Sequence, residues 1–268
     1  MKRTLNGIDY HYIDPTGNIT ILVESQVPVE EQPEVAKILM ERERSCEQVG
    51  YVGTGGECDI TLRMAAGEFC GNATMSAAAL FCDKAGLGVN ETRTVTARSS
   101  GCRERILVDI TRDADKGSLR VYGGSVHMPH HKGITKHALK YGDREYDLPV
   151  VAFEGIMHII AKSDDLDMSD TEAEEAVRIW CKELGAKCLG IMIVSEDMTS
   201  LRPLVYVPAI GSCFWERSCA SGTTATGAYC FENGLNNGPV ISFSEPGGVL
   251  SVTKDSDGGV ILTGKIVL

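Results

Sequence analysis

The segment Phe69-Cys70-Gly71-Asn72-Ala73-Thr74-Met75-Ser76-Ala77-Ala78 places a cysteine directly before a run of very small side chains. The same arrangement recurs in Ser218-Cys219-Ala220-Ser221-Gly222-Thr223-Thr224-Ala225-Thr226-Gly227-Ala228. Roughly thirty residues after each cysteine, a Ser-x-Gly sequence leads into an apolar strand, at 99–108 and at 244–252. A pattern repeated at this scale indicates two related domains.

The stretches between these segments predict a chain richer in strands than in helices. Short runs in which apolar and polar residues alternate, or which are rich in β-branched residues, predict strands. They are Ile19–Val23, Ile60–Arg63, Thr94–Ala97, Leu119–Tyr122, Val150–Phe153, Gly190–Val194, Leu204–Val207, Val240–Phe243 and Val260–Leu262.

Four helices are expected, and they are of two kinds. Gln32–Arg44 reads as an outer helix, and a second begins after a cap at Ser169 or Asp170 and ends at Gly185. The two helices that follow the cysteines carry small residues on all sides, so that strands can approach them closely from several directions. We expect an α/β (α+β) fold in which each domain is a barrel-like β-sheet wrapped around one central helix.

Composition narrows the class of protein. The chain has 268 residues, 43% of them hydrophobic and 24% charged, with a formal net charge of −11 and no Lys/Arg-rich run. This charge argues against a nucleic-acid or membrane partner and favours a small-molecule ligand. The sequence shows no signal-peptide pattern and no apolar stretch of spanning length, which predicts a cytoplasmic protein whose ten cysteines are reduced thiols.

The paired cysteines suggest acid–base chemistry. A cysteine in the first turn of a helix lies where free backbone N–H groups and the helix dipole favour the thiolate, so we expect a lowered pKa for Cys70 and Cys219. Two such groups suit racemisation, in which a thiolate removes the α-proton from one face while a thiol donates to the other. The alternative is that both are buried, inert cysteines.

Backbone N–H groups at the two helix N-termini are candidates to hold the substrate carboxylate as negative charge develops on it. No lysine is identified for pyridoxal phosphate and no Gly-rich turn has nucleotide-binding spacing, so we expect no cofactor. The N–H groups proposed for this task belong to Gly71, Asn72, Ala220, Ser221 and Gly222.

The chain resembles the diaminopimelate epimerase superfamily through Pro15-Thr16-Gly17-Asn18, Cys70-Gly71-Asn72 and Trp215-Glu216-Arg217-Ser218-Cys219. Within that superfamily it is most similar to the histidine racemases of staphylopine-type metallophore pathways. The segments that carry this closer resemblance are 17–23, Cys46-Glu47-Gln48-Val49-Gly50, 67–76 and Glu245-Pro246-Gly247-Gly248.

The resemblance implies two pseudosymmetric domains, at 1–125 and 126–268, with the strand at about 259–268 a candidate to return to the first. It implies an active site in the interdomain cleft, and catalysis without metal or cofactor. It also implies that Asn18 organises the cleft and that Glu216 lies near the substrate ammonium group. A turn residue and a solvated loop carboxylate are the respective alternatives. The resemblance implies a monomer, but the residues leave open whether the chain forms a homodimer.

The sequence departs from diaminopimelate epimerase in ways that make diaminopimelate a poor substrate. The segment 62–67 lacks the expected substrate-binding asparagine, the segment from Glu216 to Cys219 is shorter, and Ala220 replaces a glycine. We expect Glu47, assisted by Gln48, to select histidine, because a carboxylate can accept an imidazole N–H. A buried structural ion pair is the alternative role for Glu47.

The sequence leaves open the role of three histidines and the choice among three functions. His127, His130 and His131 read as a loop, for which a solvated linker is favoured over a metal site because no acidic or cysteine partner has ligand spacing. A histidine racemase, a diaminopimelate epimerase or proline/hydroxyproline racemase-type enzyme, and a non-catalytic thiol redox sensor are the three candidate functions.

Overall fold

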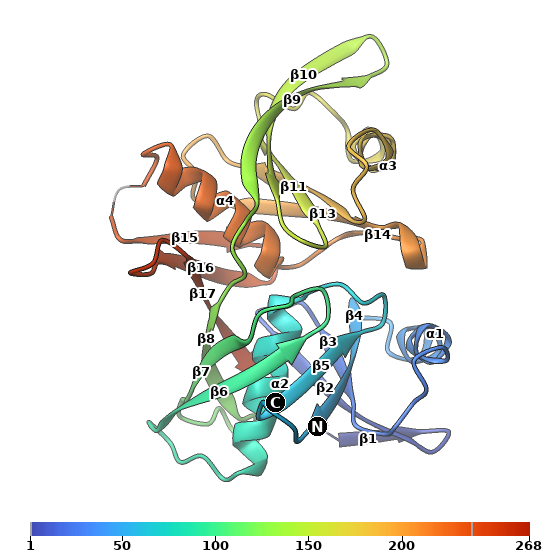
Figure 1. The fold of residues 1–268 in the computed structure, drawn as a ribbon, viewed down its shortest axis with the longest axis vertical. Coiled ribbons are helices and arrows are strands. Elements are labelled where there is room, and N and C mark those ends of the chain that lie inside the picture. Colours follow the sequence, from blue (N-terminus) through green and yellow to red (C-terminus); the bar gives the residue numbers. More distant parts are fainter. Residues whose placement is uncertain (1, 237) are drawn as a thin grey trace. The chain divides into compact units, whose positions relative to one another are not determined.

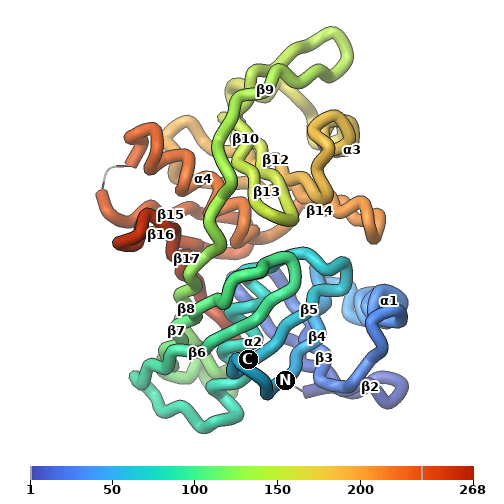
Figure 2. Tube along the Cα trace, in the orientation of Figure 1, coloured from blue at the N-terminus to red at the C-terminus, as the bar shows by residue number. Residues whose placement is uncertain are grey.

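The computed structural model describes residues 2–236 and 238–268, which form two compact units. Unit 1 extends through Met128 and includes Ile261–Leu268, whereas unit 2 is Pro129–Val260. In Figure 2 the red C-terminal strand lies beside strands from the first part of the chain within unit 1. The last strand of the chain therefore completes the unit in which the chain begins.

Unit 1 contains a closed ring of strands. Hydrogen bonding follows the order β1-β2-β3-β4-β5-β6-β7-β8-β17, and β17 also pairs with β2, so that eight strands close on themselves. The elements are β1 (Lys2–Leu5), β2 (Ile8–Pro15), β3 (Thr20–Val23), α1 (Gln32–Arg42), β4 (Gln48–Thr54), β5 (Ile60–Met64), α2 (Gly71–Lys84), β6 (Thr92–Ser99), β7 (Ile106–Arg112), β8 (Val121–His127) and β17 (Val260–Val267).

Helix α2 runs through this barrel (Figure 1). It contacts β2, β3, β5, β6, β7 and β8, and most of its residues are buried. Close contact on every side requires small side chains, which Ala73, Thr74, Ser76 and 77–79 supply. The expected small-residue helix inside a barrel-like sheet is confirmed for unit 1, whereas in the described residues the six-stranded sheet of unit 2 does not close on itself.

Unit 2 is built from a six-stranded sheet in the order β14-β13-β12-β11-β10-β9, together with the hairpin β15-β16. Its elements are β9 (Gly133–Tyr141), β10 (Arg144–Ala152), β11 (Met157–Lys162), α3 (Asp170–Glu183), β12 (Leu189–Val194), β13 (Leu201–Val207), the 3-10 helix η1 (Pro208–Ile210), β14 (Ser212–Trp215), α4 (Ala220–Glu232), β15 (Val240–Glu245) and β16 (Gly248–Lys254).

The two units share one connectivity. In unit 1, α1 connects the parallel pair β3–β4 and α2 connects the parallel pair β5–β6. In unit 2, α3 connects the parallel pair β11–β12, and α4 lies between β13 and β15, which are joined by a parallel bridge from Ser200 to Ser244. The repeated topology agrees with the duplication inferred from the cysteine-led segments.

The outer helices follow local signals. Helix α3 begins after Ser169, whose side chain forms a capping box with Glu172, and it buries Trp180 with Ala173 and Val177 in the core of unit 2. Helix α1 starts at Gln32 as expected and ends at Arg42, two residues before the predicted end. These helices each cover one face of a sheet, because only one of their faces is apolar.

Strand boundaries differ most where local turns intervene. Leu119 was expected in a strand, but it forms a tight turn with Lys116, and β8 begins at Val121. The strand predicted from Val150 begins at Arg144, because its polar first half pairs with β9 along the whole of both strands. In the described residues, no helix is long and apolar enough to cross a membrane.

Gly101 lies against the loop that leads to Cys70, and it gives the first testable prediction. Its φ is +68°, and a Cβ there would lie 2.2 Å from the Phe69 backbone nitrogen. We expect Gly101→Ala to lower the free energy of unfolding by roughly 3 kcal/mol, from left-handed strain and overpacking together. Chemical denaturation measures this change.

The control is Gly86→Ala, because Gly86 has φ +75° and open space around its would-be Cβ. It should cost only the conformational strain, about 1–2 kcal/mol. Equal losses in the two variants would contradict the steric argument.

Candidate active site

Cys70 is the N-cap residue of α2. Its backbone is extended, with φ −133° and ψ 114°, and its sulfur accepts a hydrogen bond from the Ala73 N–H at 3.4 Å. The thiol donates to Oε1 of Gln48 at 2.9 Å. The sulfur is thus held at the end of the helix where free backbone N–H groups favour negative charge.

Gln48 belongs to a polar network on strands β3 and β4. Its Nε2 donates to Oδ1 of Asn18 and, at 2.8 Å, to Oγ1 of Thr20. Asn18 in turn donates from Nδ2 to a carboxylate oxygen of Glu47 at 2.6 Å. Because β3 and β4 are parallel, with Thr20 opposite Gln48, the residues that precede them reach the same edge of the sheet. The structure therefore brings Asn18, Glu47, Gln48 and Cys70 together.

Gly71 and Asn72 are the first two residues of α2, and both are buried. Their backbone N–H groups belong to the first turn, whose N–H groups have no partner within the helix. They therefore lie beside Cys70, at the helix end that attracts anions.

Cys219 occupies the matching position in unit 2. It is the N-cap residue of α4, with φ −129° and ψ 102°, and 5% of it is exposed. Its thiol donates a hydrogen bond to the Glu216 carboxylate, and its sulfur lies 3.6 Å from Oγ of Ser221. The backbones of Cys70 and Cys219 thus have nearly the same conformation, whereas their side-chain partners differ.

The three residues after Cys219 form the first turn of α4. Ala220 and Gly222 are buried in the first turn of α4. A Cβ at Gly222 would lie 2.0 Å from Sδ of Met192 and 3.3 Å from the Cys219 sulfur, so glycine keeps this turn close to its neighbours. The Ala220 methyl group fits within the buried turn.

Burial overrides the helix dipole at Cys219. It raises the pKa of this thiol well above its ordinary value, and the charge of Glu216, with that of Glu245 when Glu245 is ionised, raises it further. The expectation of a lowered pKa is therefore wrong for Cys219. The dipole contributes about 1 kcal/mol, which is less than the cost of forming an anion in a buried site beside carboxylates.

His158 was not singled out in the sequence. It lies on β11, and its Nε2 is 2.9 Å from Oγ of Ser221, which itself approaches the Cys219 sulfur. Complete burial lowers the pKa of His158 to about 3, so the ring is neutral. The available signal was a lone histidine in an otherwise apolar strand, and Gly190 on β12 leaves room for its ring.

Glu245 is the second residue missed as a site residue. It ends β15; one oxygen of its carboxyl accepts the Cys219 backbone N–H at 2.8 Å, and the other lies 2.5 Å from Oγ1 of Thr223. In the sequence, Glu245 stands out only as the first residue of the Glu-Pro-Gly-Gly motif shared with the histidine racemases. A glutamate at the end of a strand, directly before Pro-Gly-Gly, is equally compatible with a solvated turn.

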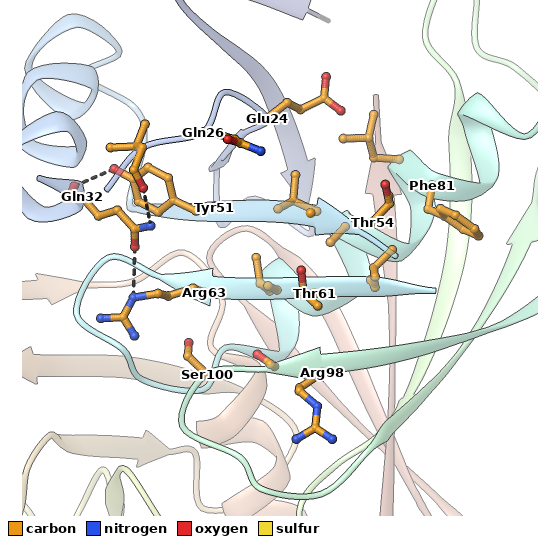
Figure 3. A pocket seen from close by; sticks show the side chains of 18 of the residues that line it. Glu24, Gln26, Gln32, Tyr51, Thr54, Thr61, Arg63, Phe81, Arg98 and Ser100 are labelled. Atoms are coloured by element: carbon orange, nitrogen blue, oxygen red, sulfur yellow. Dashed lines mark hydrogen bonds between the residues drawn. The ribbon is translucent and has the colours of Figure 1, made fainter. Parts of the chain in front are cut away.

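Unit 1 also contains an open cavity of ≈ 1280 Å³ that neither cysteine lines (Figure 3). Gln32 lies on one side of this cavity. Its backbone carbonyl accepts a hydrogen bond from the Tyr51 hydroxyl at 2.6 Å, and its side-chain oxygen accepts one from Nε of Arg63 at 3.0 Å. These bonds join the start of α1 to β4 and β5. We assign them a structural role, because they fasten α1 to the sheet.

The three histidines expected in a loop lie at and just after the end of β8. His127 is the last residue of β8, and His131 lies 3.1 Å from the Glu232 carboxylate. The described residues contain no group of three or more His, Cys, Asp or Glu side chains arranged to hold a metal ion.

Solved structures with a similar fold include epimerases. A hydroxyproline epimerase from Agrobacterium vitis, solved with trans-4-hydroxy-L-proline bound, has a TM-score of 0.65 at 12% identity, over 97% of this chain and 88% of that one. A predicted epimerase from Pseudomonas aeruginosa has a TM-score of 0.66 at 14% identity, over 97% and 96%. At these identities the likeness shows the fold.

Sequence relatives are more specific. The family described as the histidine racemase CntK N-terminal domain matches residues 7–266. A histidine racemase of Fusobacterium nucleatum is 32% identical over 234 residues, 85% of this chain and 83% of that protein. One from Staphylococcus aureus is 29% identical over 256 residues, 92% and 88%. Because the family match spans nearly the whole chain, this protein belongs to the histidine racemase family.

Proposed function

We propose that the chain interconverts L- and D-histidine without a cofactor, by moving the α-proton between Cys70 and Cys219. The observation that carries the proposal is the matched placement of the two thiols, each at the N-cap of the central helix of a duplicated unit. The same position in both units supports a shared chemical role for the two thiols.

The proposed reaction needs one thiolate and one thiol in each turnover. The thiolate takes the α-proton, the electron pair of the broken C–H bond moves into the carboxylate, and the opposite thiol protonates the other face of the carbon. Burial and neighbouring carboxylates favour the protonated form of Cys219, which suits it to donate the proton. Cys70, whose sulfur accepts the Ala73 N–H, is then the base after its thiol has lost the proton that it shares with Gln48.

Acidifying an α-carbon requires more than a reactive thiolate. In the proposed mechanism the substrate carboxylate is held by backbone N–H groups of the first turns of α2 and α4, where negative charge develops. Each such donor is commonly worth about 3 kcal/mol in a transition state. We assign this task to Gly71, Asn72, Ala220, Ser221 and Gly222, and we place the substrate ammonium group near Glu216.

We propose Glu47 as the residue that recognises the imidazole. Its carboxylate is half-buried and accepts a hydrogen bond from Asn18, and a carboxylate is a good acceptor for an imidazole N–H. Gln48 links Asn18 to Cys70, so recognition of the side chain and placement of the base share one network.

Replacing either cysteine tests the proton-transfer step. Because a serine hydroxyl is a far weaker acid than a thiol, Cys70→Ser and Cys219→Ser should each lower racemisation by roughly 10²–10⁴-fold. Circular dichroism of the folded variants and polarimetry of histidine measure structure and activity.

Matched controls are Cys82→Ser and Cys230→Ser, which replace buried cysteines further along the same two helices. Full activity in a folded Cys70→Ser variant would disprove the two-base assignment.

Replacing Glu47 tests substrate choice. Glu47→Gln keeps an oxygen that can accept from Asn18 but removes the charge, so the preference for histidine over other amino acids should fall by about tenfold, the worth of one charge-assisted hydrogen bond. Solvent-deuterium exchange across histidine, diaminopimelate, hydroxyproline and other L-amino acids measures the preference.

Glu57→Gln is the control, because Glu57 lies exposed on the same unit. An unchanged preference in Glu47→Gln would mean that another residue selects the substrate.

A further inference from the structure

The carboxyl of Glu245 closes a ring of hydrogen bonds around the first turn of α4. One oxygen accepts the Cys219 backbone N–H at 2.8 Å, and the other lies 2.5 Å from Oγ1 of Thr223. Oγ1 of Thr223 also lies 2.7 Å from the Cys219 carbonyl oxygen. The ring therefore passes through the backbone of Cys219 on both sides of its α-carbon.

Counting protons gives the preferred state of this ring. The Thr223 hydroxyl has one proton and two oxygens within reach, the Cys219 carbonyl and a Glu245 carboxyl oxygen. An ionised Glu245 leaves one of these acceptors without that proton. A protonated Glu245 instead donates to Thr223, which donates to the carbonyl, and every group is satisfied.

The surroundings favour the same state. Glu245 is 5% exposed, and among the described residues no Lys, Arg or His pairs with it. Burial raises its pKa to about 8, although its bonds to Thr223 and Cys219 oppose the rise. At neutral pH the carboxyl is accordingly held largely as the neutral acid.

We propose that Glu245 is a positioning residue for Cys219: as a neutral acid it holds the cysteine-bearing turn of α4, and when it ionises it hinders formation of the Cys219 thiolate. This role rests on the proposed function of Cys219 as an acid and base. Glu245 acts through Cys219, because its contacts are with the backbone of that residue and with Thr223.

Comparison with the first turn of α2 in unit 1 shows which part of this hydrogen-bonded ring is found in unit 2 alone. Thr74 stands four residues after Cys70, as Thr223 does after Cys219, and its hydroxyl donates to the Cys70 carbonyl at 2.7 Å. Strand β6, the counterpart of β15, ends at Ser99 where β15 ends at Glu245. The threonine is common to both units, whereas the carboxyl belongs to unit 2.

Other ionisable groups around the turn are few. Glu216, in the loop before α4, contacts the same thiol, and His158 on β11 reaches Ser221 as a neutral ring. Arg217, in the same loop, is exposed and accepts the Gly247 N–H on its carbonyl. On β13, Arg202 pairs with Asp170. Ionisation of Glu245 therefore adds charge mainly to the surroundings of Cys219.

Glu245→Gln separates position from charge. Its amide NH₂ can donate to Thr223 and its oxygen can accept the Cys219 N–H, so it imitates the protonated acid but cannot ionise. Between pH 7 and pH 9 the neutral fraction of Glu245 should fall from about nine-tenths to about one-tenth. Relative to the parent, kcat/KM of the variant for histidine should thus rise about tenfold over this interval.

Threonine variants provide a second test and a matched control. Thr223→Val removes the hydroxyl that lies between the Glu245 carboxyl and the Cys219 carbonyl, so the pKa of Glu245 should shift in this variant. Thr74→Val removes the equivalent hydroxyl beside Cys70 and should leave this ionisation where it is in the parent. If Glu245→Gln does not fold, this pair still decides the proposal.

A measurement without turnover separates this inference from the proposed function. Carbon-13 NMR of δ-labelled glutamate, with Glu245→Gln to identify the signal, should show one carboxyl that titrates near pH 8. An active Cys219→Ser variant would end the two-base function and leave this titration intact. A carboxyl titrating in the ordinary glutamate range, or a pH profile unchanged in Glu245→Gln, would overturn the role of Glu245.

Discussion

Close packing of strands against a small-residue helix positions the cysteine-bearing turn in each unit. Strands approach α2 from several directions because half of its residues are Ala, Ser, Thr or Gly. A helix held this way cannot shift without colliding with the surrounding strands. Its N-terminus is thereby a fixed point, and Cys70 lies at that point. The same composition in α4 fixes Cys219.

Duplication supplies equal backbones but unequal surroundings. Cys70 bonds to the amide of Gln48, within a network that continues to Asn18 and Glu47. Cys219 is surrounded instead by acids and by a neutral histidine reached through Ser221. In the two-thiol reaction that we propose, this difference favours one proton distribution in the resting enzyme.

The pKa of Cys219 depends more on the burial of its thiol than on its position at a helix N-terminus. A helix N-terminus favours a thiolate by about 1 kcal/mol, whereas burial beside carboxylates opposes it more strongly. The same burial keeps His158 neutral and Glu245 protonated. The thiol that we assign as the resting proton donor therefore lies near a neutral histidine and a protonated Glu245, with Glu216 as its hydrogen-bond acceptor.

The duplication, the cysteine-led helices and the outer helix capped at Ser169 or Asp170 could be predicted from the sequence alone, because they depend on local spacing and side-chain size. The histidine racemase family followed from the resemblance of its motifs. Strand boundaries near Leu119 and Val150 required the actual pairing partners. Only the tertiary structure joined Asn18 to Glu47, or His158 and Glu245 to the surroundings of Cys219. These residues are distant in sequence, and burial, which sets their protonation, arises only when the chain has folded.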